Sequence, residues 1–296
     1  ANQIAMETLP TQNDPEALAD AVAERVHGLL RSHSAEGDVE GIGLVVPGMV
    51  DRRRGVVVNS PALAWRNVDL REMLSARTGL RVFIENAPIA CALARMWLDQ
   101  TGSPESFAYV TVSDGVGAGV VVKGEVLRGH NDTAGEFGHL PLALDGPRCL
   151  CGLTGCLEAY TSNLATLGRY LGLDPALPED RDALRRSGLS PHDLITRARA
   201  GDRPALATLQ ETARMLGAGV AGIITSLNPA RVYVDGEIMV GWDLLGPTVL
   251  EAARSRTLTD AAAATPIVPV SEGGVARLRG ATALLVARQF SAPQVA

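Results

Sequence analysis

The spacing of apolar residues changes repeatedly between the two-residue period of strands and the 3.6-residue period of helices. Residues 2–9 alternate as a strand would, and apolar residues recur at helical spacing between Leu18 and Leu29. Asp14-Pro15 precedes that second run, as an N-cap followed by a proline suited to the first helical position. The pattern then predicts a strand over 42–46, a hairpin over 50–58, a helix over 70–76, a strand over 80–84 and a helix over 88–98.

Strands and helices also alternate in the rest of the chain. Strands are predicted over 107–112, 119–122, 125–127, 231–234 and 267–270. Helices are predicted over 157–171, 191–200, 204–227, 242–256 and 274–289, after a loop-rich stretch over 129–155. We therefore predict an α/β protein with two lobes, residues 1–100 and residues 101–279, and we expect the C-terminal helix over 280–296 to complete the first lobe.

Composition and charge narrow the classes of function. The 296 residues are 46% hydrophobic and 20% charged, which is ordinary for a globular protein and excludes a mostly disordered chain. The formal charge is −6 and the longest basic run is Arg52-Arg53-Arg54, which we expect in a solvated hairpin rather than a nucleic-acid surface. No apolar stretch approaches the ~20 residues that span a bilayer, and no secretory signal is visible. We expect a cytoplasmic protein with no membrane partner.

The cysteines indicate metal chemistry. Cys149, Cys151 and Cys156 lie within eight residues of one another, and Cys91 lies in an apolar helical stretch. Disulfide geometry disfavours a bridge between Cys149 and Cys151, which are almost adjacent. A thiol cluster in a protein that is not secreted is more often a metal site than a disulfide framework.

His139 joins the three clustered cysteines in the pattern H-x9-C-x-C-G-x2-G-C. Three thiolates and one imidazole complete the closed tetrahedral shell of a structural zinc site, so the predicted ligands are His139, Cys149, Cys151 and Cys156. Gly152 and Gly155 let the backbone turn tightly enough for the thiolates to face one ion. The alternative is a loop with three reduced cysteines and no metal.

Two stretches of sequence resemble a known family. Residues 133–139 read T-A-G-E-F-G-H, and residues 149–158 read C-L-C-G-L-T-G-C-L-E. Together they are similar to the signature of the ROK family, which joins sugar-responsive bacterial repressors and sugar kinases. Glu85-Asn86 resembles the Glu-Asn-Asp motif of that family, and the similarity extends to Gly280-Ala281. The resemblance implies an actin-like (ribonuclease H-like) fold with a cleft between two α/β lobes.

The same resemblance implies a sugar site. Asn86, Glu136, His139 and Glu158 fall on sugar-contacting positions of the family, and Gly48 is a weaker candidate for a backbone contact. Carboxylates and amides can bind sugar hydroxyls, which both donate and accept hydrogen bonds. His139 would bind zinc through one ring nitrogen and a sugar hydroxyl through the other. The alternative for Glu136 and Glu158 is a pair of solvated carboxylates.

Three departures distinguish the chain from the family's kinases. Ala87 stands where kinases place the aspartate that accepts the proton of the attacking hydroxyl, a contribution typically worth about 10²–10⁴-fold in rate. The N-terminal Asp-x-Gly-Gly-Thr motif is not found. The glycine-rich loop begins Ser113-Asp114, and the carboxylate of Asp114 would repel a triphosphate. Likewise, Glu237 stands where kinases often have a glycine beside the nucleoside. We expect Gly115, Gly117 and Gly119 to form only a tight turn between strands.

These departures predict a protein that is not an enzyme. We expect the effector-binding and oligomerisation body of a sugar-responsive ROK-type transcriptional regulator that has lost its kinase apparatus. Its partners would be a sugar or sugar derivative, operator DNA through an N-terminal domain absent from this chain, and further copies in a homodimer or homotetramer. We therefore expect the chain to be part of a longer protein. The alternatives are an N-terminally truncated ROK-type kinase of a hexose or amino sugar, and a zinc-stabilised scaffold without a ligand.

Overall fold

The N-terminal part of the chain combines short strands with three helices. The computed structural model describes residues 3–33, 39–98, 102–270 and 274–290, so the predictions for residue 2 and for 291–296 lie outside the described residues. The elements up to residue 98 are α1 (Pro15–Ser32), β1 (Ile42–Val46), β2 (Met49–Asp51), β3 (Val56–Ser60), β4 (Trp65–Val68), α2 (Leu70–Thr78), β5 (Val82–Asn86) and α3 (Ala87–Leu98). Asp14 caps α1 as predicted, because its side chain accepts the N–H of Glu16 at 3.1 Å.

The remaining described elements form a larger α/β body. They are β6 (Phe107–Val112), β7 (Val116–Val122), β8 (Glu125–Val126), the 3-10 helix η1 (Phe137–His139), α4 (Leu157–Thr161), α5 (Asn163–Leu171), α6 (Pro178–Ser187), α7 (Pro191–Arg199), α8 (Arg203–Leu227), β9 (Arg231–Asp235), the 3-10 helix η2 (Glu237–Gly241), α9 (Trp242–Arg254), α10 (Asp260–Ala263), β10 (Ile267–Val270) and α11 (Gly274–Phe290).

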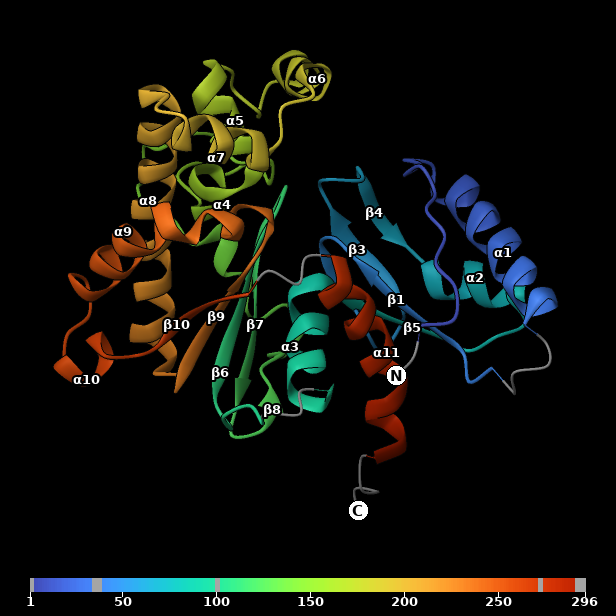
Figure 1. Cartoon of the computed structure of the whole chain (residues 1–296). Helices are drawn as coiled ribbons and strands as arrows, with labels where there is room; N and C mark the ends of the chain where they lie inside the picture. Colours follow the sequence, from blue (N-terminus) through green and yellow to red (C-terminus); the bar gives the residue numbers. More distant parts are fainter. Residues whose placement is uncertain (1–2, 34–38, 99–101, 271–273, 291–296) are drawn as a thin grey trace.

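The strands of the described residues form three sheets. β1 and β5 pair in parallel, β2, β3 and β4 form an antiparallel sheet, and five strands pair in the order β10-β9-β6-β7-β8. Figure 1 shows α3 and α11 side by side between the five-stranded sheet and β1–β5, with α8 and α9 beyond the opposite face of the larger sheet. The boundaries of the two predicted lobes stay a prediction.

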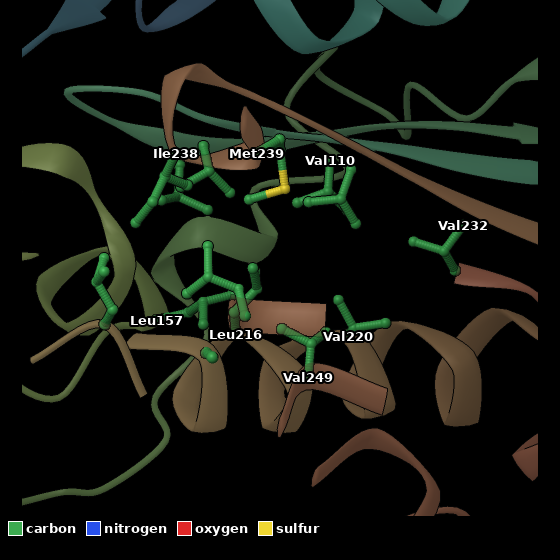
Figure 2. Close-up of a cluster of buried hydrophobic side chains, with 14 of the residues drawn as sticks. Val110, Leu157, Leu216, Val220, Val232, Ile238, Met239 and Val249 are labelled. Atoms are coloured by element: carbon green, nitrogen blue, oxygen red, sulfur yellow. The ribbon is translucent and has the colours of Figure 1, made fainter. Parts of the chain in front are cut away.

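The largest hydrophobic core lies between the five-stranded sheet and the long helix α8. Figure 2 shows Leu157 in this core with Leu216 and Val220 of α8 and Val249 of α9. Leu157 is 1% exposed and directly follows Cys156, the last of the clustered cysteines. The cysteine-rich segment is therefore anchored to the core at its C-terminal end.

The fold departs from the predicted elements in a few places. Residues 3–9 form no strand, so that expectation is wrong within the described part of the chain. The helix predicted over 157–171 is divided at Ser162, whose backbone is extended and whose side chain caps α5 by accepting the N–H of Ala165. β4 and α6 were not predicted, because β4 has two exposed polar residues and α6 buries only Leu184. No described helix is long and apolar enough to cross a bilayer.

Candidate functional site

The segment over 139–156, called here the cysteine loop, is folded tightly on itself. Pro141 pairs with Cys156 and Arg148 with Thr154 in isolated β-bridges, and the N–H of Leu142 donates to the carbonyl of Gly155 at 2.7 Å. Gly155 has φ +72°, and a Cβ there would lie 1.5 Å from the carbonyl oxygen of Ala143. The close approach of the two backbone segments therefore requires glycine at this position.

The cysteine loop brings the four predicted metal ligands together. One potential ligand atom from each of His139, Cys149, Cys151 and Cys156 lies within 4.8 Å of every other. The Sγ atoms of Cys151 and Cys156 are 3.8 Å apart, and Cys149 Sγ is 3.7 Å from His139 Nδ1. Zinc–sulfur bonds of about 2.3 Å in a tetrahedron place neighbouring sulfurs about 3.8 Å apart, which is the spacing of Cys151 and Cys156. The donor set and its dimensions are compatible with zinc.

The surroundings of these thiols favour the neutral form, so thiolate ligands form here only when a metal ion supplies positive charge. Burial raises the pKa of Cys156 to about 11, and it also raises the pKa of Cys149 far above its ordinary value. Without a cation both groups are neutral thiols at neutral pH. A bound divalent ion supplies the positive charge that stabilises thiolates, so metal binding here releases protons. Cys91 lies in α3 and is not among the four clustered residues.

Glu136 and His139 lie at opposite ends of one helical turn, η1 and its N-cap. His139 Nδ1 faces Cys149, and its Nε2 is 4.0 Å from a carboxylate oxygen of Glu136. Burial raises the pKa of Glu136, His139 counteracts that rise, and Glu158 adds to it. The imidazole thus lies between the thiol cluster and a carboxylate, with one ring nitrogen directed to each.

Glu158, in the first turn of α4, connects the cysteine loop to β7. One carboxylate oxygen accepts the Cys149 S–H at 3.4 Å, and the other accepts the N–H of Val116 at 2.9 Å. Both oxygens therefore have partners within the protein. No pattern along the chain indicates the contact with Val116, which lies 42 residues earlier.

Asn86 and Gly48 lie at the carboxyl ends of two neighbouring parallel strands. Val46 of β1 is paired with Asn86 of β5, and Gly48 follows β1 by two residues. The Asn86 side chain accepts the N–H of Ile89 at 3.1 Å and so caps the start of α3. No contact among the described residues joins this pair directly to Glu136 or Glu158.

Strand β7 lies between these two groups of predicted site residues. A Cβ at Gly117 would meet the side chain of Pro88, at the start of α3 beside Asn86. A Cβ at Gly138, between Glu136 and His139, would lie 1.8 Å from the carbonyl oxygen of Val116 at the start of β7. The two groups therefore pack on the same strand from different elements.

A cavity of about 730 Å³ separates the sheet of β2, β3 and β4 from the cysteine loop. Asn59, Ser60 and Trp65 line it from the strands, and Cys149, Cys151 and Gly152 line it from the loop. Ligand pockets of proteins have volumes of roughly 300–1,000 Å³, so this space can admit a small molecule. One wall of the space is built by the proposed metal ligands.

The turn over 113–115 before β7, called here the glycine-rich turn, is bordered by carboxylates. Gly117 and Gly119 lie within β7, paired with β6, so the expectation that they form only a turn with Gly115 is wrong. Ser113 Oγ donates to one oxygen of Glu237 at 3.1 Å, and the Asn163 amide donates to the other at 2.9 Å. Burial, together with the neighbouring charge of Glu237, raises the pKa of Asp114. The N–H of Val116, at the end of the turn, donates to Glu158. Asp114 and Glu237 stand out in the sequence, but Asn163, which lies 74 residues from its partner Glu237, does not.

Comparisons with known proteins agree on one family. The sequence model of the family described as "ROK family" matches residues 1–288 of this chain. A putative xylose repressor of Caldicellulosiruptor sp. is 35% identical over 207 residues, which cover 69% of this chain and 52% of that protein. The chain thus spans about half the length of that relative. Relatives described as glucokinase and as xylose repressor match at similar identity.

Two solved structures share the fold at equal TM-scores of 0.76. One is a ROK family transcriptional regulator described as a homologue of the E. coli MLC protein, 26% identical, with 91% of this chain and 68% of that chain covered. The other is a ROK family glucokinase from Streptomyces griseus in complex with glucose and AMPPNP, 27% identical, with 92% and 88% covered. These structures share the actin-like sugar-kinase fold predicted here, and the comparisons do not separate regulator from kinase.

Proposed function

The chain belongs to the ROK family, and on that premise we propose that it is the effector-binding and oligomerisation body of a sugar-responsive transcriptional regulator. In this proposal a sugar or sugar derivative binds near Asn86, Glu136, His139, Glu158 and Gly48. Zinc, held by the cysteine loop, fixes the orientation of the imidazole. Phosphoryl transfer from ATP has no part in the function.

The observation that carries the proposal is the set of carboxylates around the glycine-rich turn. Glu237 accepts hydrogen bonds from Ser113 and Asn163, and Glu158 accepts the N–H of Val116. A phosphate loop needs donors that are available for phosphate oxygens, and charged acceptors nearby repel a polyphosphate. Here the donors are used by acids, and Asp114 adds a third carboxyl group. This supports a site that does not bind ATP.

The environment of Ala87 also supports a loss of catalysis. A methyl group accepts no proton, and the neighbouring side chains are already engaged. Asn86 caps α3, and Glu85 pairs with Arg128 at 2.7 Å in a setting where its side chain is 2% exposed. General-base catalysis contributes about 10²–10⁴-fold, so a sugar bound here lacks that part of the activation.

The cysteine loop supports a role in positioning the sugar contacts. Zinc on His139 Nδ1 leaves Nε2 on the side of Glu136, 4.0 Å away. A sugar hydroxyl between these two groups can donate to the carboxylate and accept from the imidazole N–H. Metal binding therefore fixes both the tautomer and the direction of the donor.

Operator DNA and further copies of the chain complete the proposal. Relatives described as xylose repressors support a DNA partner, which we assign to a part of the protein outside this chain. A homodimer or homotetramer would present paired DNA-binding domains to a palindromic operator. The alternative function is a ROK-type sugar kinase, which the relatives described as glucokinase support.

Calorimetric titration with hexoses, pentoses, N-acetylated amino sugars and sugar phosphates tests the proposed site. Replacing Glu136 with Gln should weaken binding of the responding sugar by about tenfold to a hundredfold, because a charge-assisted hydrogen bond is lost. Glu179→Gln, on the exposed surface of α6, is the matched control and should leave affinity unchanged. If no compound of the panel binds, or if Glu136→Gln binds it like the wild type, the proposed sugar site is wrong.

A further inference from the structure

A separate cavity of about 460 Å³ is lined by arginines. It lies beside β5, among the turn between β2 and β3, α2 and α11. Its lining includes Arg52, Arg53, Arg71, Arg81 and Arg128, beside apolar residues of β5, α3 and α11. No Asp or Glu is among the described residues of this lining. The basic run that the sequence suggested to be a solvated hairpin therefore borders a recess.

Arg71, on α2, is fixed in this cavity by three main-chain carbonyls. Its Nε donates to Val82 at 3.2 Å, and its two terminal nitrogens donate to Arg53 at 2.9 Å and to Arg52 at 2.6 Å. A guanidinium carries five N–H donors, so two remain for a ligand. Carbonyl oxygens hold the side chain in place but do not neutralise its charge.

The same contacts place the arginines of the turn around Arg71. The backbone N–H of Arg71 donates to the carbonyl of Gly55 at 3.2 Å, and a Cβ at Gly55 would overlap the Arg71 side chain. The turn is therefore wrapped closely around Arg71. The exposed side chains of Arg52 and Arg53 start from this turn.

The cavity has more positive than negative charge near it. Arg128 pairs with the buried carboxylate of Glu85 at 2.7 Å, and the charge of Arg52 also acts on Glu85. Arg81 pairs with Glu40 at 3.0 Å on the surface. Arg52 aside, the described contacts give two carboxylates to the four arginines Arg53, Arg71, Arg81 and Arg128. Like charges that converge on a recess produce a positive potential, which an anionic ligand offsets.

We propose that this cavity binds a small phosphate monoester, with its phosphate on Arg71 and Arg53 and its organic part against Phe83 of β5 and Leu284. Arginine suits this role because its planar fork matches two phosphate oxygens. A concave site with apolar walls fits a small molecule better than the convex backbone of a duplex. The proposal does not rest on the proposed function, because none of the predicted sugar-contacting residues lines this cavity.

The location on β5 links this anion site to the predicted sugar site. Val82, Phe83 and Ile84 line the cavity, and the same strand ends at Asn86. Arg128 lines the cavity and pairs with Glu85, the residue before Asn86. A phosphate that draws Arg128 toward it therefore changes the contact next to Asn86.

The test is calorimetric titration of the chain with inorganic phosphate and with glucose 6-phosphate at low salt. Arg53→Gln should weaken the binding of both phosphate and glucose 6-phosphate by about tenfold. Arg186→Gln, at an exposed position on α6, makes the same change of charge and should have little effect on either affinity. Arg53 is exposed, so its replacement should leave the melting temperature unchanged. Glucose 6-phosphate should bind more tightly than inorganic phosphate, because its organic part also contacts the apolar side of the cavity.

Several results would overturn the anion site. Absence of binding for both probes contradicts it, and so does an equal loss in Arg53→Gln and Arg186→Gln. If Glu136→Gln abolishes glucose 6-phosphate binding and Arg53→Gln does not, the ligand binds at the sugar site instead. If Arg53→Gln lowers affinity for random-sequence duplex DNA, and glucose 6-phosphate does not compete with that DNA, the arginines form a nucleic-acid surface. Failure of the sugar panel alone leaves the phosphate result interpretable.

Discussion

Replacing Gly155 with alanine should disrupt the cysteine loop, whereas the same replacement at Gly152 should leave it folded. Both glycines have positive φ angles, +72° at Gly155 and +96° at Gly152. A Cβ at Gly155 would lie 1.5 Å from the carbonyl oxygen of Ala143, but a Cβ at Gly152 would meet nothing within 4 Å. The two variants therefore share the conformational strain and differ in the clash.

The magnitudes follow from this difference. A side chain in the left-handed region costs roughly 1–2 kcal/mol, which is the whole expected effect of Gly152→Ala. In Gly155→Ala the backbone must also move away from Ala143, which breaks the hydrogen bond from Leu142 and the bridge between Pro141 and Cys156. Each of the two lost hydrogen bonds adds about 0.5–1.5 kcal/mol, so we expect a total cost of about 2–5 kcal/mol.

Zinc affinity provides the assay, because the free energy of metal binding is coupled to folding of the loop. Zinc per chain is measured by atomic emission, and its release is followed with a chromogenic chelator. Gly155→Ala should bind zinc at least about fivefold more weakly than Gly152→Ala, because the difference of about 1–3 kcal/mol is converted at about 1.4 kcal/mol for each factor of ten. Equal release from the two variants, or release from Gly155→Ala at the wild-type rate, would refute the reasoning.

Three further predictions concern the metal, the missing base and the buried carboxylate. Cys151→Ser should release about one zinc per chain and expose the cysteine loop to protease, and a wild-type protein without zinc by metal analysis would contradict the metal site. Ala87→Asp should tighten sugar binding in calorimetry yet give little phosphoryl transfer, because the carboxylates near Ser113 remain; rapid ATP-dependent phosphorylation would contradict this. Burial raises the pKa of Glu136, so the folded chain holds that proton to higher pH than the unfolded chain, and the ionised group lowers stability above about pH 4.5. At pH 7 the Glu136→Gln variant should therefore have a higher melting temperature than the wild type, and this difference should narrow toward pH 4.5. A difference in melting temperature that stays constant across that pH range would contradict the prediction.

Much of the fold can be predicted from local sequence patterns. The cap and proline at Asp14-Pro15 predict the start of α1, and the strands predicted over 119–122 and 125–127 are found as the paired β7 and β8. These signals are local, so tertiary packing has little to add. By contrast, α6 has almost no apolar stripe, and its ten residues could not be distinguished from a solvated loop.

The candidate site was predictable only where its residues are close in sequence. The spacing of His139, Cys149, Cys151 and Cys156 predicts a cluster, and the structure brings the four together. The contacts from Glu158 to Val116 and from Asn163 to Glu237 join distant segments, so no pattern along the chain indicates them. The cavity around Arg71 likewise depends on how α2 meets the turn after β2.

Zinc at the proposed site would have a consequence beyond stability. His139 and Glu158 each touch the cysteine loop and also reach groups outside it, Glu136 and Val116 respectively. Leu157, between the loop and α4, is anchored in the core. Loss of the metal should therefore displace the predicted sugar contacts before it unfolds the domain.

The most direct test of the central claim is sugar binding with and without Mg-ATP. A sugar that responds in the calorimetric panel is titrated again at saturating Mg-ATP, and the mixture is then analysed for sugar phosphate. The account predicts the same affinity in both titrations and no product, because the carboxylates beside the glycine-rich turn exclude the nucleotide phosphates. Tighter binding with Mg-ATP, accompanied by accumulating sugar phosphate, would contradict the account and identify the chain as a sugar kinase.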